Sequence, residues 1–303
     1  MIHIEKADRN DKFVFVVIPV FNRKEYTHDC LASFEQQDSN CFKVIVVDDG
    51  STDGTAEMIR QEFPNTILLK GNGNLWWVGS INLGIRHALT ICQDADSILV
   101  INDDLVVLPN YVSSLMNVAE SNPGSIIGSV ETINTAPCII KSGGVTINWK
   151  NAKATVLNKG ESLKQFPQGH FVEVDILTGR GTLFPSQLFR EAGLYDEVHF
   201  KQCGDTELPV RVNFKFGYPL LVSYDAVVIS YPGNKKNIND RKTYTLSDFK
   251  EYFFGIRSHS NLIDKFWIAY NIAPSKFWFV RYYFFNVGRI IGRFITRLRF
   301  RIS

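Results

Sequence analysis

The chain alternates short apolar runs with longer stretches in which apolar residues have helical spacing, and this pattern constrains the fold most. The runs are rich in β-branched residues, as buried strands are. They are Phe13–Ile18, Phe42–Val47, Thr66–Leu69, Ser97–Ile101 and Ser125–Val130. Helices are expected from near Thr52 with Asp53 as a cap, over Ser80–Cys92, and from Pro109. This alternation predicts an α/β fold in which a mostly parallel sheet has helices on both faces and binds ligands at the carboxyl ends of its strands.

The pattern becomes irregular after Pro137, where glycines and prolines divide the chain into short pieces. In this part we expect a strand at Val172–Thr178 and helices at Ser186–Ala192 and Asp205–Phe216. We predict one large domain over residues 1–235, with a first half of about 1–108 and a second of about 109–235. Residues 236–303 are expected to form a helical, basic extension.

Composition places the chain among globular intracellular proteins. Of its 303 residues, 45% are hydrophobic and 21% charged, which suits a chain with a substantial core. The cysteines are odd in number and widely scattered, which argues against a disulfide framework or a zinc site: Cys30, Cys41, Cys92, Cys138 and Cys203. The N-terminus is too polar for a secretory signal, and no apolar run approaches the roughly 18 residues of a spanning helix. We therefore expect a cytoplasmic protein.

A carboxylate pair ends the second expected strand, in the segment V-V-D-D-G-S-T-D-G-T from Val46 to Thr55. An aspartate such as Asp48 or Asp49 at a strand's carboxyl end can accept a hydrogen bond from a pyrimidine imide. The alternative is a strand-to-helix turn whose aspartates only cap the helix. The segment alone does not decide between the two.

A second pair, Asp103-Asp104, follows Asn102 directly after the strand S-I-L-V-I. Hard divalent cations such as Mg²⁺ or Mn²⁺ prefer carboxylate oxygens and are often shared with substrate phosphates. Adjacent carboxylates repel one another, and a bound cation would offset that cost. A solvated turn also favours these residue types and remains the alternative.

Together these motifs resemble the family 2 glycosyltransferases of the GT-A fold. The resemblance also rests on V-I-P-V-F-N at Val17–Asn22 and on G-N-G-N-L-W-W-V-G-S-I-N-L-G-I-R-H-A-L at Gly71–Leu89. It extends from about Phe13 to Ser230. It is closest to bacterial rhamnosyltransferase-like enzymes that build surface polysaccharides such as O-antigen. The first half would then bind the nucleotide and the second half the acceptor.

The resemblance implies a set of donor-binding residues around the strand ends. They are Pro19, Phe21 and Asn22 in the nucleotide pocket, Asp48 and Asp49 at the pyrimidine, Asn82 and Gly84 near the donor, and Asp103 at the ribose or sugar. Asp104 would hold Mg²⁺ or Mn²⁺. Trp76 and Trp77 either stack on the donor or belong to the core. Arg180 either steadies a phosphate or the acceptor, or forms a structural ion pair.

The catalytic base implied by the resemblance is Asp205, in the segment G-D-T-E-L-P-V-R, with Glu207 at the position of the family's second acid. Asp205 would remove the proton from an acceptor hydroxyl as it attacks the sugar, so that one displacement inverts the anomeric centre. Two positions depart from the family. Ser230 or Tyr231 stands where a metal-binding histidine is common, and Gly204 replaces the acid that commonly precedes the base.

The C-terminal segment predicts an amphipathic helix. From Lys276 to Ser303 there are seven basic residues and no acidic one. At 100° per residue Arg289, Arg293, Arg297 and Arg301 fall within one 120° arc, opposite Val287, Ile291, Phe294, Ile295, Leu298 and Ile302. Residues 277–303 would therefore lie in the headgroup plane of an anionic membrane. The alternative is a helix packed on the protein's own core with a solvated basic face.

The resulting expectation is an inverting glycosyltransferase at the inner face of the cell membrane. It would move a sugar from a UDP- or dTDP-sugar, with dTDP-rhamnose preferred, to a lipid-linked oligosaccharide or growing glycan. An inactive glycosyltransferase-like scaffold is one alternative. A nucleotidyltransferase is another, but it predicts a G-x-G-x-R loop where P-V-F-N-R stands. No motif indicates nucleic-acid binding, and a homodimer is left open.

Overall fold

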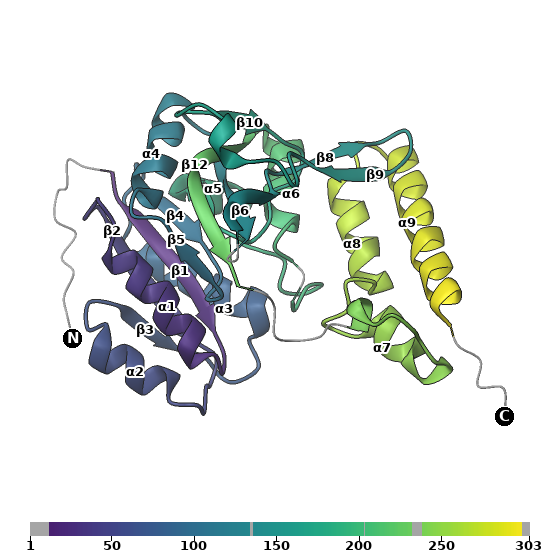
Figure 1. The fold of residues 1–303 in the computed structure, drawn as a ribbon, viewed down its shortest axis with the longest axis horizontal. Coiled ribbons are helices and arrows are strands. Elements are labelled where there is room, and N and C mark those ends of the chain that lie inside the picture. Colours follow the sequence, from purple (N-terminus) through teal and green to yellow (C-terminus); the bar gives the residue numbers. More distant parts are fainter. Residues whose placement is uncertain (1–11, 134–135, 203, 232–237, 299–303) are drawn as a thin grey trace.

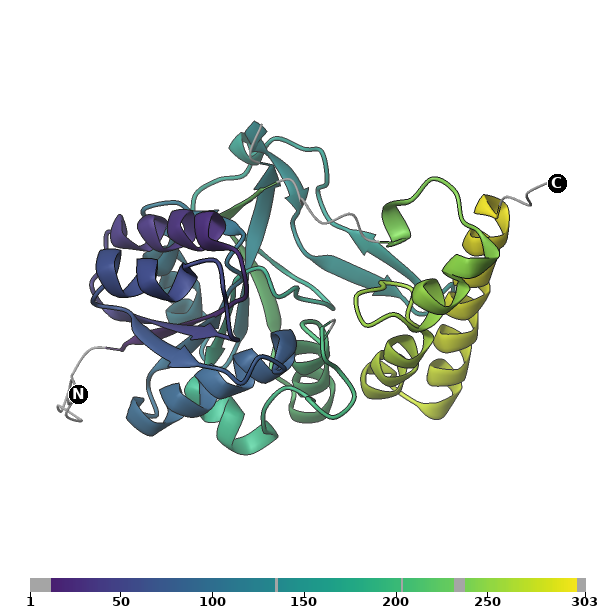
Figure 2. The same ribbon diagram turned by 90° about the horizontal axis from the view of Figure 1, so that it is seen from below.

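In the computed structural model, which describes residues 12–133, 136–202, 204–231 and 238–298, a central sheet lies between layers of helices. Figure 1 shows a second, helical part beside this α/β part, joined to it by a two-stranded hairpin. The view from below in Figure 2 shows the same two parts, with the hairpin passing between them. The chain thus forms a sheet-based body and a C-terminal helical unit.

Four parallel strands form the first half of the sheet, in the order β3-β2-β1-β4. They are β1 (Val14–Val20), β2 (Phe42–Asp48), β3 (Ile67–Lys70) and β4 (Ser97–Val100). Every residue of β1 and β4 is buried, as expected for strands covered on both faces. Because Val17 pairs with both Ile45 and Val100, the carboxyl ends of β1, β2 and β4 meet at one edge.

Alternate residues of these strands face two different helical layers. Phe15, Val17 and Ile45 pack with Ile81 and Ile85 of α3. Val14, Val16 and Ile18 pack in a second cluster with residues of α1, α2 and α4. The helices are α1 (Lys24–Glu35), α2 (Thr55–Glu62), α3 (Trp76–Ile91) and α4 (Tyr111–Ser121). Each fully buried aliphatic or phenylalanine side chain stabilises this arrangement by about 1.5–3 kcal/mol.

The second half of the sheet is mixed, so the prediction of a mostly parallel sheet holds only for the first half and for the β6–β12 pair. β11 lies antiparallel between β4 and β6, and β12 is parallel to β6 but antiparallel to β5 and β10. The strands are β5 (Leu105–Val107), β6 (Ile126–Ile133), β7 (Ala136–Ser142), β10 (Phe171–Glu173), β11 (Thr182–Pro185) and β12 (Leu220–Ser230). The strand direction changes at β11, which runs antiparallel to both of its neighbours.

Among the predicted boundaries that differ from the structure, three lie near the candidate site. The strand expected at Val172–Thr178 ends at Glu173, because Asp175 turns away to accept a hydrogen bond from the Ile147 N–H at 2.6 Å. Helix α3 begins four residues before Ser80, and α6 (Glu207–Phe216) begins two residues after Asp205. Helix α5 has the predicted bounds, Ser186–Ala192.

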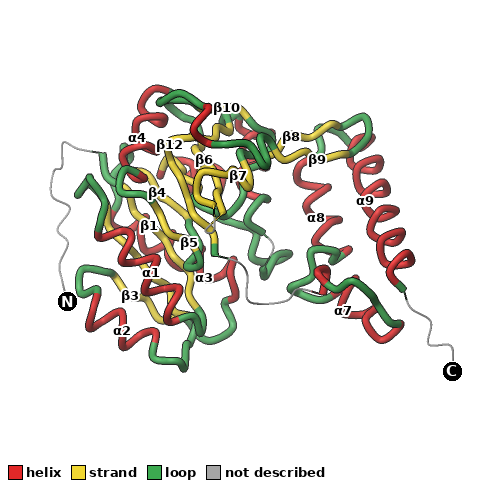
Figure 3. Tube along the Cα trace, viewed as in Figure 1, coloured by secondary structure: helices red, strands yellow, loops and turns green. Residues whose placement is uncertain are grey.

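The C-terminal unit consists of α7 (Phe249–Phe254), α8 (Leu262–Ile272) and α9 (Lys276–Arg297). In the tube view of Figure 3 the hairpin of β8 (Val145–Asn148) and β9 (Lys153–Val156) reaches these helices. Short 3₁₀ turns lie at η1 (Leu163–Gln165), η2 (Ile238–Asp240) and η3 (Leu246–Asp248). One small cluster, with Tyr244, Tyr252, Phe253, Ile290 and Phe294, fills the unit, and a second joins Ile147 and Val210 to Ile272.

Helix α9 is amphipathic, but part of its arginine face, which was expected to meet membrane headgroups, contacts the protein itself. Arg289 donates to the carbonyl oxygens of Ala152 and Asn151, each at 2.5 Å, and Arg297 donates to that of Asn239 at 3.2 Å. Phe294 is buried, whereas Ile295 beside it is 61% exposed. Two arginines of the helix are therefore bound to the protein itself. Arg301 and Ile302 lie outside the described residues.

Two further observations concern the described residues. No helix among them is both long enough and apolar enough to cross a membrane. Cys30, Cys41, Cys92 and Cys138 are free thiols, and Cys203 lies outside the described part of the chain.

Candidate active site

The first turn of α3 is held by Asp49 from the end of β2. One carboxylate oxygen accepts the N–H of Gly73 at 2.8 Å, and the other accepts those of Leu75 at 2.8 Å and Trp76 at 3.0 Å. A carboxylate satisfies the free N–H groups at a helix start and interacts favourably with its dipole. A Cβ at Gly71 would lie 2.6 Å from Asp49 Oδ1, so only glycine fits there. Asp49 thus sets the course of the loop from Gly71 into α3.

The end of β1 is tied to the same turn. Asn22 has a left-handed backbone (φ 51°), and its side-chain oxygen accepts the Thr52 N–H at 2.7 Å. Asp48 accepts the N–H of Ser51 at 2.8 Å, and the Ser51 hydroxyl accepts the N–H of Asn22 at 2.9 Å. Pro19 is buried within β1, whereas the Phe21 ring is 42% exposed. The predicted nucleotide residues from two strands therefore lie together at one sheet edge, with an aromatic ring exposed.

Asp103 and Asp104 share one guanidinium. Arg23 NH1 lies 2.8 Å from Asp103 Oδ1 and 3.3 Å from Asp104 Oδ2. Burial raises the pKa of Asp103 to about 6, although Arg23 lowers it. Asp103 Oδ2 and Asp104 Oδ1 are buried without a hydrogen-bond partner. Two unpartnered carboxylate oxygens beside an incompletely neutralised pair are a donor set that fits a hard divalent cation.

Trp77 joins this acidic pair to the predicted base. Its indole N–H donates to the side-chain oxygen of Asn102 at 2.7 Å. A Cβ at Gly179 would lie 3.0 Å from the Trp77 ring and 2.7 Å from the Asp205 Cβ. Asp205 Oδ2 accepts the Gly179 N–H at 3.0 Å. Trp77 therefore contacts Asn102 directly, and Gly179, which binds Asp205, lies against its ring.

The two tryptophans have different surroundings. Trp77 packs against the main core cluster, while Trp76 is partly exposed, has φ 58°, and carries the Arg257 guanidinium 5.7 Å from its ring centroid. Since Asp49 binds the Trp76 N–H, the consecutive Trp76 and Trp77 connect all three acidic motifs. That Asp49, Asp104 and Asp205 serve one common site remains a prediction.

Three other predicted residues contact the protein itself. The buried Asn82 donates to the Tyr195 carbonyl oxygen and to Glu197, each at 2.9 Å. At Gly84 a Cβ would lie 2.3 Å from Val17 Cγ1, so the glycine allows close packing of α3 on β1. Arg180 lies 2.9 Å from Glu131. Asn82 and Gly84 thus secure α3, and Arg180 has the ion pair that was its structural alternative.

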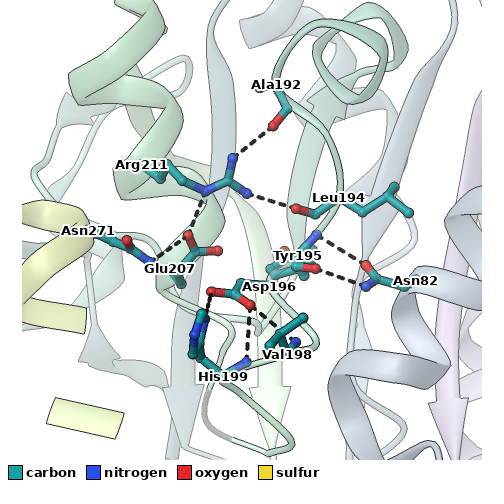
Figure 4. Close-up of polar contacts among 10 residues, drawn as sticks. All are labelled: Asn82, Ala192, Leu194, Tyr195, Asp196, Val198, His199, Glu207, Arg211 and Asn271. Carbon is teal, nitrogen blue, oxygen red and sulfur yellow. Dashed lines mark hydrogen bonds and ion pairs between the residues drawn. The ribbon is translucent and has the colours of Figure 1, made fainter. Parts of the chain in front are cut away.

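Figure 4 shows the polar network that holds the segment after Asp205. Glu207 is fully buried and accepts bonds from Arg211 at 2.5 Å and from Asn271 of α8 at 3.1 Å. Arg211 also donates to the carbonyl oxygens of Ala192 and Leu194. Burial raises the pKa of Glu207, an effect that Arg211 opposes. The segment that follows the predicted base is therefore anchored to both α5 and the C-terminal unit.

A second contact with the C-terminal unit lies beside this network. His199 pairs with Asp196 at 2.6 Å, and its ring stacks on Trp267 of α8 with centroids 3.6 Å apart. The sequence did not reveal Arg23, Trp267 or Asn271 as residues of this region. Arg23 directly follows the P-V-F-N motif, and that position could have indicated a residue of the site. No local sequence feature indicates that Trp267 and Asn271 contact it.

The two departures from the family pattern have structural counterparts. A Cβ at Gly204 would lie 2.8 Å from Val78 Cγ2 and 3.0 Å from Phe200 Cβ, which leaves no room for an acid. The Tyr231 N–H donates to the Asp104 carbonyl oxygen at 3.4 Å, while its hydroxyl donates to Asp29 at 2.9 Å. No group of three or more His, Cys, Asp or Glu within the described ranges could hold a metal ion. Any cation here would need ligands from water or substrate.

The chain was compared with known proteins. The sequence model of glycosyl transferase family 2 matches residues 15–171. The N-acetylglucosaminyl-diphospho-decaprenol L-rhamnosyltransferase of Mycobacterium tuberculosis is 26% identical over 216 residues, covering 65% of this chain and 69% of that protein. The family match includes the segments that end in Asp49 and Asp104.

Solved structures share the fold at low sequence identity. GalNAc-T7, solved with UDP, GalNAc and Mn²⁺, superimposes with a TM-score of 0.59 at 14% identity, over 75% of this chain and 45% of that one. The mannosyltransferase PcManGT of Pyrobaculum calidifontis, solved with GDP-Man and Mn²⁺, gives 0.59 at 13% identity, over 94% and 74%. At these identities the likeness concerns the fold alone.

Proposed function

Because the chain belongs to glycosyl transferase family 2 and is a glycosyltransferase, we propose that it transfers a sugar from a nucleoside diphosphate donor with inversion. The observation that supports this most is the set of contacts of two consecutive tryptophans. Asp49 binds the Trp76 N–H, Trp77 donates to Asn102 beside the Asp103-Asp104 pair, and Gly179, which binds Asp205, lies against the Trp77 ring. One acid serves the nucleotide side, one the diphosphate side and one the acceptor side. Residues 1–235 form the catalytic domain in this proposal.

The nucleotide lies at the ends of β1 and β2. Pro19, Phe21 and Asn22 form its pocket with Asp48 and Asp49, and the exposed Phe21 ring is available for contact with the base. Asp49 already binds three backbone N–H groups, so its first task is to hold the pocket loop in place. UDP- or dTDP-sugars are the donors, with dTDP-rhamnose preferred on the similarity to the mycobacterial rhamnosyltransferase.

The diphosphate lies beside Asp103 and Asp104, whose unpartnered oxygens would hold Mg²⁺ or Mn²⁺. When bound, the cation offsets the negative charge that grows on the departing diphosphate. Arg23 fixes the two carboxylates relative to each other and neutralises part of their charge. The two solved relatives that contain Mn²⁺ support this choice of ion.

Asp205 takes the proton of the acceptor hydroxyl. The hydroxyl oxygen forms a bond to the anomeric carbon, the bond from that carbon to the diphosphate oxygen breaks, and the proton passes to the carboxylate. The Gly179 N–H holds one carboxylate oxygen at 3.0 Å and leaves the other to accept the proton. A single displacement from the opposite face inverts the centre and requires no enzyme nucleophile.

The acceptor is a hydroxyl of a lipid-linked or growing surface glycan, reached from the inner face of the cell membrane. An exposed apolar stripe on α9 supports membrane contact: Phe277 is 66%, Phe284 64% and Ile295 61% exposed. These aromatic and aliphatic side chains follow one side of the helix, an arrangement that suits a lipid surface. Residues 236–303 act as the membrane-contacting extension in this proposal.

The test is a thermal-shift screen of nucleotide sugars with and without Mn²⁺ or Mg²⁺, followed by turnover of the stabilising donor. A UDP- or dTDP-sugar should raise the melting temperature, and the cation should increase the shift. Asp205→Asn should keep this stabilisation and lose about 10²–10⁴-fold in turnover. A wild-type chain that binds donors but shows no turnover would favour the inactive scaffold. Equal turnover by wild type and Asp205→Asn would exclude this base.

A further inference from the structure

A buried carboxylate in the second half of the sheet holds two cations. Glu131 of β6 has a side chain only 8% exposed, and its Oε1 lies 2.8 Å from Lys141 Nζ and 2.9 Å from Arg180 NH1. Lys141 Nζ also lies 3.0 Å from the Ser230 hydroxyl. We refer to Glu131, Lys141 and Arg180 as the Glu131 cluster.

The cluster carries one more positive charge than it needs for its own neutrality. A single cation would balance Glu131, yet both Lys141 and Arg180 approach the same oxygen atom. Their side chains are 41% and 33% exposed, so donor N–H groups remain accessible from solvent. One cation already compensates the buried Glu131 carboxylate, so charge neutrality does not require the second.

The cluster is connected by the chain to both catalytic acids. Gly179, which precedes Arg180, donates its N–H to Asp205. Ser230 precedes Tyr231, whose N–H donates to the Asp104 carbonyl oxygen. Arg180 therefore follows the residue that binds the proposed base, and Lys141 of β7 contacts the strand end that leads to the Asp104 backbone.

The position also separates the cluster from the nucleotide. The predicted nucleotide residues are on β1 and β2, whereas the cluster belongs to β6, β7 and the loop before β11. These elements form the half of the sheet that faces the acceptor in the proposed function. A small pocket beside Glu131 is lined also by Ser142 and Thr178, whose hydroxyl groups can donate hydrogen bonds.

We propose that Lys141 and Arg180 form a binding site for a phosphate or diphosphate group of the acceptor. Glu131 holds the two cationic side chains close together. Arg180 offers a planar set of N–H donors and Lys141 a compact positive charge, and both kinds of group bind phosphate oxygens. Only the assignment to the acceptor rests on the proposed function. The anion site itself does not depend on turnover.

The first experiment measures binding of inorganic pyrophosphate by calorimetry in the absence of divalent cations. Lys141→Met and Arg180→Met should each weaken binding at least about tenfold, since each removes a charge-assisted contact. Arg60→Gln removes an arginine on α2 that is 61% exposed and paired with Glu57, and it should bind as wild type does. Equal dissociation constants in all four proteins would overturn the site. Matching melting temperatures would show that the variants are folded.

The second experiment assigns the source of the phosphate. Turnover is measured with a phosphate-bearing acceptor, and the KM values for acceptor and donor are determined separately. In Lys141→Met and Arg180→Met the acceptor KM should rise about tenfold while the donor KM stays unchanged. A rise in the donor KM alone would overturn the assignment to the acceptor. Absence of turnover in the wild type would contradict the proposed function and leave the pyrophosphate result standing.

Discussion

The sheet-based body and the C-terminal unit are built in opposite ways. In the body, strands such as β1 are buried over their whole length, and polar groups gather where the strands end. In the C-terminal unit a small aromatic cluster is buried and much apolar surface is left exposed, including Phe249, Tyr270 and Phe284. The body is thus suited to hold acids in fixed positions, and the unit to meet another surface.

The two regions nevertheless meet beside the candidate site. Arg257 lies over the Trp76 ring, Trp267 stacks on His199, and Asn271 donates to Glu207. All three contacts reach segments that carry or adjoin the tryptophans and Asp205. We therefore expect the body to supply the chemistry and the C-terminal unit to position the base side of the site. The predictions below test this division, from the largest expected effect to the smallest.

The first prediction concerns the acids of the body. Asp104→Ala should abolish measurable turnover, a loss of at least about 10³-fold, because the departing diphosphate loses its charge compensation. Mn²⁺ binding, followed by the paramagnetic signal of the free ion, should weaken in parallel. Asp94→Ala removes an exposed aspartate that precedes the amino end of β4 and should leave both measurements unchanged. Undiminished turnover in Asp104→Ala would remove the cation assignment and place the chemistry elsewhere.

The second prediction is a pH dependence confined to the body. Asp103 has a pKa of about 6 in the fold against 3.8 as its ordinary value, chiefly because it is buried. Below about pH 4 the group is protonated in both states and costs nothing; as the pH rises through about 6, the fold must ionise a buried carboxyl. The metal-free protein should lose about 3 kcal/mol of unfolding free energy over this interval.

Urea unfolding of the metal-free protein from about pH 4 to pH 7 measures this dependence. Asp103→Asn cannot ionise at this position, so its stability should fall less than that of the wild type over the same range. Parallel curves for the two proteins would contradict the raised pKa. Added Mn²⁺ should restore stability to the wild type above pH 6, since the cation binds the ionised form.

The sequence predicted the body better than the contacts between the regions. The strands before Asp48 and Asn102 were located within about two residues, because a β-branched run followed by turn residues is a local signal. The start of α3 was placed four residues late, since its cap, Asp49, lies 27 residues before Trp76. Tertiary structure decided that boundary.

The same distinction applies to the candidate site. Asp49, Asp104 and Asp205 were predicted from motif and position. The long-range partners of the acids beside them, Asp103 and Glu207, were not predicted. Arg23 meets Asp103 across 80 residues, and Asn271 meets Glu207 across 64. Spacing along the chain carries no information on such pairs. Lys141 was missed for the same reason, as its partner Ser230 is 89 residues away.

The third prediction tests whether the C-terminal unit positions the base. Asn271→Ala removes one of the two side chains that donate to the buried Glu207 and should cost about 1–3 kcal/mol in stability. The turnover number should fall several-fold because the segment of Asp205 is less well held, while donor stabilisation in a thermal-shift assay stays unchanged. A loss of stability without any change in turnover would show that the contact only joins the two regions.

Asn286→Ala is the matched control. Asn286 lies on α9 and donates to the carbonyl oxygen of Tyr282 within the same helix, at 2.8 Å. It contacts no residue of the proposed site, so its turnover should equal that of the wild type. If Asn286→Ala and Asn271→Ala lowered turnover equally, the effect would be a general one of loosening the C-terminal unit.

The last prediction concerns the exposed face of α9 and separates membrane contact from catalysis. Phe284 and Ile295 are 64% and 61% exposed, so Phe284→Ser with Ile295→Ser should change the unfolding free energy by no more than about 0.5 kcal/mol per site. Binding to phosphatidylglycerol vesicles, measured by co-sedimentation, should weaken at least about tenfold. Burial of each apolar side chain in the membrane contributes about 1.5–3 kcal/mol to binding. Turnover of a water-soluble acceptor should be unchanged.

Val198→Ser removes a side chain of the body that is 82% exposed and should bind vesicles as the wild type does. Equal vesicle binding by all three proteins would show that the apolar stripe is not the membrane-facing surface, and the C-terminal unit would then keep only its role in holding the base.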